Sequence, residues 1–128
     1  MSDAVFSNAM AWAINGSSVY AANVASWVNT WFLAPDTYMN PNLNYAQVIR
    51  GPGANVGTHT GVLDLRCMTK VVNAVLVLRT GKAPEWTETL DSGLVNWTTT
   101  YIGWLTSNKI ALEEAASEKC VTRASTVS

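Results

Sequence analysis

The segment with the richest chemistry runs from Met39 to Arg66. It begins Met39-Asn40-Pro41-Asn42-Leu43-Asn44-Tyr45-Ala46-Gln47 and continues past Arg50 to His59, the only histidine of the chain. Amide and guanidinium groups donate hydrogen bonds to carboxylates, and a tyrosine hydroxyl can both donate and accept a proton. A long polar loop between helices is more often functional than idle. The sequence therefore predicts that this loop binds a ligand.

Two helices are predicted before the loop. Asp3 can cap the first, which places Val5, Ala9, Trp12 and Ala13 on one face and ends at Asn15-Gly16. Ser17 or Ser18 can cap the second, which should stop before Pro35 and whose apolar face comprises Val24, Trp27, Val28, Trp31 and Phe32. The short turn between them predicts an antiparallel helical hairpin.

Three helices are predicted after the loop, from about Thr60 to Arg79, over Leu90 to Leu105, and from Ile110 to about Lys119. A strand over residues 71–78 is the alternative for the valine-rich part of the first. In the second, Trp97, Tyr101 and Trp104 lie at helical spacing, which favours core packing over stacking on sugars. Ser107-Asn108 can cap the third, in which Glu113, Glu114 and Glu118 are expected to face water. The fold class is all-α, built of antiparallel helical hairpins.

The composition restricts the classes of protein to which this chain can belong. The 128 residues carry a net charge of −1 and are 48% hydrophobic and 13% charged, which fits one compact domain and gives no broad basic field for nucleic acid or an anionic membrane. We expect no metal or other cofactor. The start Met1-Ser2-Asp3 does not look like a signal peptide. Cys67 and Cys120 are too far apart in sequence for a close zinc pair, and both a mutual disulfide and free thiols remain open.

The loop and its flanks resemble a known family. The residues that carry the resemblance are Trp31-Phe32-Leu33, Pro35, the run Met39 to Gln47, and Gly61 with Asp64-Leu65-Arg66. They are similar to the alginate lyase domain of polysaccharide lyases, especially fungal members, over roughly Met10 to Glu118. The resemblance implies a partial, alginate-lyase-like domain over 1–119, part of an incomplete (α/α) toroid, and an extracellular location. Residues 120–128 are expected to be a divergent, disordered tail, and open hairpin faces could meet a second copy.

The resemblance also implies a reaction, the β-elimination of a uronic-acid polymer. This reaction needs a group that neutralises the carboxylate, a base for the C5 proton and an acid for the departing O4. The family uses an Asn-Asn-His-Gly motif just beyond a segment matched here by Trp104-Leu105 and Glu113-Glu114-Ala115-Ala116. The sequence departs from the family before that motif, as a truncated or spliced product or a gene-model error would. We therefore expect this chain alone to be inactive.

The resemblance supplies the candidate substrate contacts: Asn42, Asn44, Tyr45, Gln47, His59 and Arg66. Tyr45 matches the lid-like element of the family, and Arg66 matches an arginine that looks toward sugar carboxylates. Each has a structural alternative: local packing for Tyr45, a salt bridge with Asp64 for Arg66, turn formation for the asparagines and simple exposure or helix capping for His59. The implied partner is an acidic polysaccharide, and a non-catalytic carbohydrate-binding or protein-interaction module is the alternative function. An unstable fragment without activity is the third reading.

Overall fold

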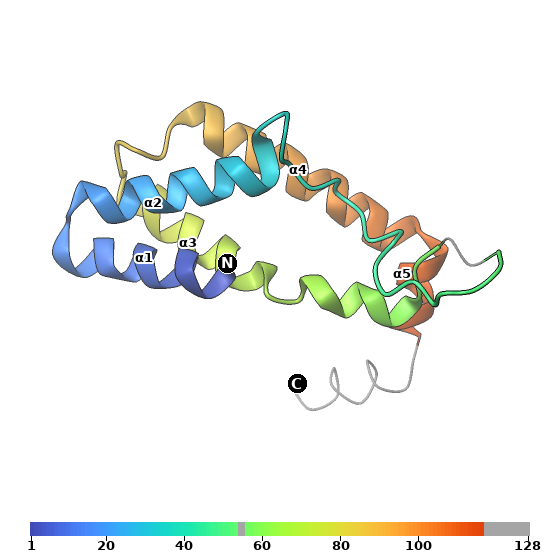
Figure 1. The fold of residues 1–128 in the computed structure, drawn as a ribbon. Coiled ribbons are helices and arrows are strands. Elements are labelled where there is room, and N and C mark those ends of the chain that lie inside the picture. Colours follow the sequence, from blue (N-terminus) through green and yellow to red (C-terminus); the bar gives the residue numbers. More distant parts are fainter. Residues whose placement is uncertain (54–55, 117–128) are drawn as a thin grey trace. The chain divides into compact units, whose positions relative to one another are not determined.

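The structure, a computed structural model, describes residues 1–53 and 56–116. In this part of the chain all regular secondary structure is helical. The helices are α1 (Ser2–Asn15), α2 (Ser18–Val28), the π-helical η1 (Asn29–Leu33), the 3₁₀ helix η2 (His59–Leu65), α3 (Met68–Thr80), α4 (Glu88–Ser107) and α5 (Lys109–Ala115) (Figure 1). The predicted all-α class is confirmed, and the alternative strand over 71–78 is wrong because those residues lie in α3. The predicted tail, Cys120 and Glu118 lie outside the described residues.

The chain divides into two compact units, which we describe separately. The first comprises Met1–Asn40 and Cys67–Thr98, and the second comprises Pro41–Arg66 and the residues from Thr99 onward. Helix α4 begins in the first unit and ends in the second. The long polar loop therefore belongs, from Pro41 onward, to the same unit as α5.

The first unit is built around α1, which packs against both α2 and α3. Its end is as predicted: Gly16 adopts the left-handed conformation at φ 77°, and its N–H donates to the carbonyl of Trp12. Glycine suits this position because it has no Cβ to clash. The side chains of the unit that are 0% exposed are Val5, Ala9, Ala21, Val24, Val71, Ala74 and Leu78. The predicted apolar faces of the first hairpin are confirmed in part. Val5, Ala9, Val24, Val28 and Phe32 are buried, Trp12 is half-buried, and Ala13, Trp27 and Trp31 are exposed.

A π-helical turn, which the sequence did not predict, extends α2 to Leu33. It carries Phe32, which is 2% exposed and meets the ring of Trp97 edge-on at a centroid distance of 4.7 Å. The indole N–H of Trp97 donates to the carbonyl oxygen of Met39 at 2.7 Å. An edge-to-face pair adds roughly 0.5–1.5 kcal/mol to the burial of its rings. This contact fixes the point where the chain leaves the first unit.

The helix predicted from Thr60 to Arg79 is two helices. The 3₁₀ helix η2 ends at Leu65, a turn follows at Arg66 and Cys67, and α3 begins at Met68. Gly61 lowers helix propensity, and it also packs directly against Ala46, so the segment follows the loop rather than the helix period. Tertiary packing has overridden the periodicity here.

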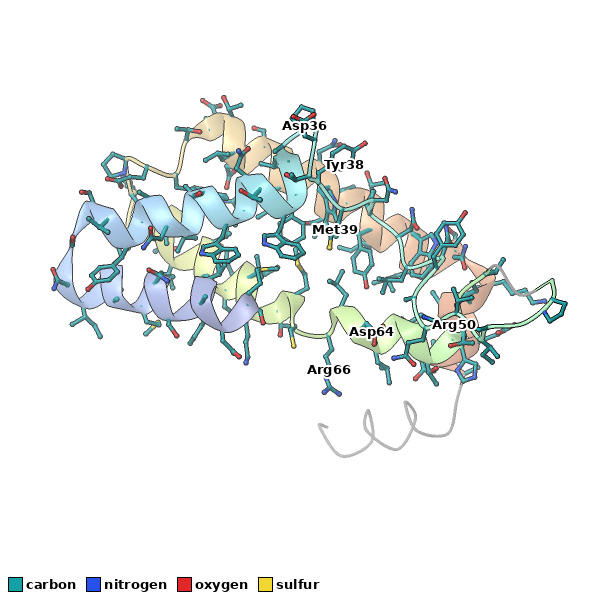
Figure 2. The ribbon with its side chains drawn as sticks, in the orientation of Figure 1. Asp36, Tyr38, Met39, Arg50, Asp64 and Arg66 are labelled. Carbon is teal, nitrogen blue, oxygen red and sulfur yellow. The ribbon has the colours of Figure 1, made fainter. Side chains whose placement is uncertain are left out.

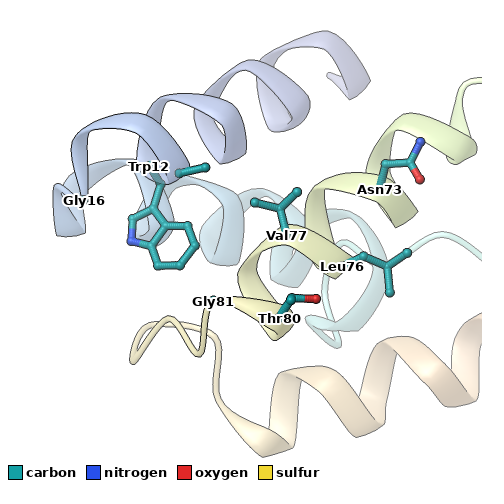
Figure 3. A pocket seen from close by; sticks show the side chains of 8 residues that line it. Trp12, Gly16, Asn73, Leu76, Val77, Thr80 and Gly81 are labelled. Carbon is teal, nitrogen blue, oxygen red and sulfur yellow. The ribbon is translucent and has the colours of Figure 1, made fainter.

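A groove of about 720 Å³ lies between the C-terminal ends of α1 and α3 (Figure 3). The ring of Trp12 covers Gly81 so closely that a Cβ at Gly81 would lie 2.5 Å from the ring. The groove is lined by Trp12, Ala13, Gly16, Asn73, Leu76, Val77, Thr80 and Gly81. The absence of a side chain at Gly81 therefore permits the end of α1 to approach α3.

Polar contacts connect α3 with the beginning of α4. The guanidinium of Arg79 donates to both carboxylate oxygens of Asp91, at 2.9 and 2.6 Å, and the Trp86 indole donates to the same carboxylate at 3.0 Å. The Arg79 and Trp86 hydrogen bonds together hold the pKa of Asp91 below its usual value. Bidentate arginine–carboxylate pairs combine charge with fixed geometry. This cluster stabilises the turn between α3 and α4.

The cluster predicts a pH dependence of stability. The folded-state pKa of Asp91 is depressed, so its stabilisation is present above the unfolded-state pKa and is lost as the pH falls through the folded-state pKa. Urea unfolding should therefore show the stability difference between wild type and Asp91→Asn shrinking as the pH is lowered from about 5 to 2. A difference that stays constant over this range would show that the Asp91 charge does not stabilise the fold.

Candidate functional site

The loop in the second unit is held by close backbone packing around Ala46. The N–H of Gly57 donates to the carbonyl of Asn44, and the N–H of Thr58 donates to the carbonyl of Ala46 at 3.1 Å. A Cβ at Gly57 or Gly61 would lie 2.5 Å from the Ala46 carbonyl oxygen. Two segments separated by about ten residues are thus held together, and the missing side chains at Gly57 and Gly61 make the close approach possible.

Asn44, a candidate sugar contact, has a structural role in this unit. Its side-chain oxygen accepts hydrogen bonds from the Trp104 indole N–H at 2.8 Å and from the Asn108 amide at 3.4 Å. Asn108 also caps α5, as predicted, by accepting from the N–H of Ile110 at 2.9 Å. Trp104 is half-buried and stacks with Tyr101, whose pKa is raised by burial. Asn44 therefore ties the loop to the junction between α4 and α5.

Gln47 ties the other side of the turn to η2. Its amide N–H donates to Asp64 at 2.7 Å, and its amide oxygen accepts from the Thr60 hydroxyl at 3.4 Å. Its backbone carbonyl accepts from the Thr58 hydroxyl at 3.0 Å. Gln47 also has a positive φ of 50°, which non-glycine residues seldom adopt. The Asp64 carboxylate is thus one of the groups that hold Gln47 in place.

His59 meets a residue that the sequence placed in water. Its Nδ1 lies 2.7 Å from Oε2 of Glu114, and the two side chains are 47% and 4% exposed. The prediction that Glu114 faces water is wrong: α5 packs on η2, and Glu114 lies on the packed face. Glu113, on the same helix, is exposed as predicted. The helix was recognised, but its partner face could not be identified from a run of two glutamates.

Tyr45 lies between the two anchored residues of the turn and is 72% exposed. Asn42 is half-buried and accepts the N–H of Asn44 at 3.3 Å, which is the turn-forming alternative considered for it. Arg66 is exposed at the end of η2, and Figure 2 shows its side chain extending away from its own segment of ribbon. Side-chain hydrogen bonds within the unit are made by Asn42, Asn44, Gln47 and His59. The side chains of Tyr45 and Arg66 are exposed.

This arrangement has the chemical elements of a saccharide contact. An exposed aromatic ring can lie against the apolar face of a sugar, its hydroxyl can hydrogen-bond, and a guanidinium can pair with a carboxylate. Among the described residues, no group of three or more histidine, cysteine or acidic side chains is placed to hold a metal ion. Cys67 is exposed. The unit therefore offers binding groups on an anchored loop.

The sequence identifies three residues that hold the loop but does not predict that role. Trp104 was expected in the core, Asn108 as a helix cap, and Glu114 in water, yet all three hold the loop. Trp97 and Tyr101 are buried as predicted. Only the indole N–H and amide groups, which need partners when buried, carried a signal for these roles.

Comparison with known proteins identifies the family of this helical domain and its loop. The family model described as alginate lyase matches residues 1–119. The chain belongs to the alginate lyase family. A crystal structure of an alginate lyase from Bacteroides ovatus, at 1.60 Å resolution, is similar with a TM-score of 0.86 and 28% sequence identity over 91% of this chain. The match covers 30% of that longer alginate lyase, so this chain spans less than a third of its length. No curated protein matches the sequence.

The packing around Ala46 leaves no room for a side chain at Gly61. Gly61→Ala places a methyl group against the Ala46 backbone and should lower the free energy of unfolding by about 1–3 kcal/mol. The matched control Gly51→Ala meets no atom within 4 Å and should change stability by less than about 0.5 kcal/mol. Urea unfolding followed by tryptophan fluorescence measures both. Equal effects of the two substitutions would refute the close packing of the loop.

Proposed function

We propose that the loop of residues 41–66 binds a uronic-acid polymer and forms part of the substrate wall of an alginate-lyase-type cleft, within an (α/α) toroid. The observation that carries the proposal is the exposed Tyr45 ring on a turn whose neighbours Asn44 and Gln47 are both anchored. A rigid turn loses little conformational freedom when it binds a ligand. Membership of the alginate lyase family supports a polyuronate as that ligand.

Each exposed candidate has a role in this proposal. Tyr45 packs its ring on a sugar face and hydrogen-bonds through its hydroxyl, while Arg66 pairs with a uronate carboxylate. Asn42, Asn44 and Gln47 shape the turn, since their side-chain oxygens or amides bond within the unit. This division of roles gives the polymer one aromatic and one cationic contact.

We further propose that these 128 residues bind the polymer without cleaving it. β-Elimination requires stabilisation of the enolate that forms beside C6 and a base for the C5 proton. The sequence contains no Asn-Asn-His-Gly run, the motif that the family resemblance assigns to that task. Loop contacts that hold the sugar equally well in the ground state and the transition state do not by themselves accelerate the elimination.

The polymer would be met outside the cell, where the family resemblance places the protein. None of the helices described is both long and apolar enough to cross a membrane. The tripeptides Asn15-Gly16-Ser17 and Asn96-Trp97-Thr98 fit the acceptor pattern for glycans in a secreted eukaryotic protein. These sites support an extracellular location in our proposal.

Binding of a mannuronate oligosaccharide, measured by titration calorimetry, tests the site. Tyr45→Ala should weaken binding about three- to tenfold by removing the ring, and Arg66→Gln about tenfold by removing the charge. Tyr38→Ala and Lys82→Gln are the matched controls, because both replace exposed side chains outside the loop. Weakening by the controls equal to that of Tyr45→Ala and Arg66→Gln would refute the assigned site.

Incubating the chain with the same oligosaccharide tests whether it cleaves the polymer. Elimination creates an unsaturated uronate that absorbs in the ultraviolet, and we expect no product above the uncatalysed background from this chain. Robust product formation that is independent of Tyr45 and Arg66 would overturn both the binding-only function and the site.

A second candidate function, association with another copy of the chain, is supported by α1. Phe6, Met10 and Ile14 follow one another at intervals of four residues and are 36%, 40% and 85% exposed. The only charged residue of α1, Asp3, pairs with Lys70, so two such faces can meet without like-charge repulsion. Rows of residues at i and i+4 are the ridges that pack between crossing helices.

This face predicts concentration-dependent self-association. Sedimentation velocity should show a rising weight-average mass over about 1–100 µM for wild type, and Ile14→Glu should abolish the rise by placing charges in the contact. Ala22→Glu, on the exposed side of α2, is the control and should leave the rise intact. A constant monomer mass for wild type would exclude this candidate.

A further inference from the structure

The contact between His59 and Glu114 is an unusual feature of the second unit. Among the described residues, Glu114 is the only buried charged side chain, and Nδ1 of His59 lies 2.7 Å from its carboxylate. A buried carboxylate costs several kcal/mol unless hydrogen bonds and charges compensate it. The hydrogen bond between the two side chains therefore holds the His59 ring at one place on α5.

The position of the His59 ring on α5 determines where the loop lies. His59 directly follows Gly57 and Thr58, whose N–H groups donate to the carbonyls of Asn44 and Ala46. These two carbonyls flank Tyr45 in the sequence. A continuous path of contacts thus runs from Glu114 through His59 and the two amides to the exposed tyrosine.

We propose that His59 and Glu114 are positioning residues, which hold the 57–58 segment against the turn and so present Tyr45 to the sugar. The inference rests on the proposed function of Tyr45 and gives His59 a supporting role in place of direct contact with the polymer. Glu114 is too deeply buried to meet a polymer itself. Its carboxylate acts on binding through the position of His59.

The neighbouring charged groups have partners of their own. Asp64 accepts a hydrogen bond from Gln47, and Lys109 lies 4.0 Å from Glu113 on the exposed side of α5. The Lys109–Glu113 pair is on the same helix as Glu114 but is 89% and 50% exposed, so it should contribute little. It provides a matched control for an ion pair that does not reach the loop.

Amide hydrogen exchange measured by NMR tests the positioning role without any ligand. His59→Ala should raise the exchange rates at the N–H groups of Gly57 and Thr58 by about tenfold or more. Without the contact to Glu114, local opening of this segment costs less free energy. Amides of α1 to α3 should keep their wild-type rates. His59→Asn, which retains an N–H donor, should restore protection to within about threefold of wild type, and Lys109→Ala should leave all rates unchanged.

Two exchange results would overturn the inference. Unchanged rates at Gly57 and Thr58 in His59→Ala would show that the pair does not hold the loop, and a uniform rise in every helix would show a role in global stability only. Should His59→Ala fail to fold, Glu114→Gln decides the matter, since it keeps an acceptor for the imidazole but removes the charge. Glu114→Gln should raise exchange at the same two amides, and wild-type rates there would count against the inference.

Calorimetry with a mannuronate trisaccharide connects the pair to binding. His59→Ala should weaken binding about three- to tenfold, and His59→Asn should restore most of the affinity. Faster exchange in His59→Ala combined with wild-type affinity would overturn the link to the sugar. If wild type itself does not bind the trisaccharide, the proposed function fails, and exchange at Gly57 and Thr58 alone decides whether the pair anchors the loop.

Discussion

The second unit depends on the hydrogen bonds that the Asn44 side-chain oxygen receives from Trp104 and Asn108. An indole N–H and an amide in a half-buried site need partners, and leaving either without one would cost roughly 1–3 kcal/mol. Both donors lie at the junction of α4 and α5, so the loop is fixed to that junction at a single oxygen. The close packing of Gly57 and Gly61 on Ala46 and the Gln47–Asp64 bond require the turn to stay in that register.

These contacts change the roles that we assign to the polar residues of the loop. A sequence rich in asparagine and glutamine can bind sugars through those amides, yet here the amides satisfy one another and their neighbouring helices. Their contribution to recognition is to keep the turn rigid, while exposed groups at Tyr45 and Arg66 remain on its surface. Polar residues that form turns and polar residues that bind ligands have the same composition, so hydrogen-bond partners are needed to distinguish them.

Local signals predicted much of the helical framework. Gly16 ends α1 and Asn108 begins α5 as expected, because cap residues act through their own backbone neighbourhood. The break at Arg66 and Cys67 was missed because a long apolar period outweighed one glycine, and the π turn over residues 29–33 leaves no mark in the apolar pattern. Glu114 was misplaced because its burial depends on η2, a partner more than fifty residues away in the chain. Helical periodicity does not identify the distant partner of a polar side chain.

The binding function proposed for the loop requires that Tyr45, on its anchored turn, contacts the sugar. Intermolecular nuclear Overhauser effects between the isotope-labelled chain and an unlabelled mannuronate trisaccharide test this most directly. We expect such effects between the Tyr45 ring protons and the sugar ring protons. Contacts confined to helices α1 to α3, with none at Tyr45 in a saturated complex, would contradict it.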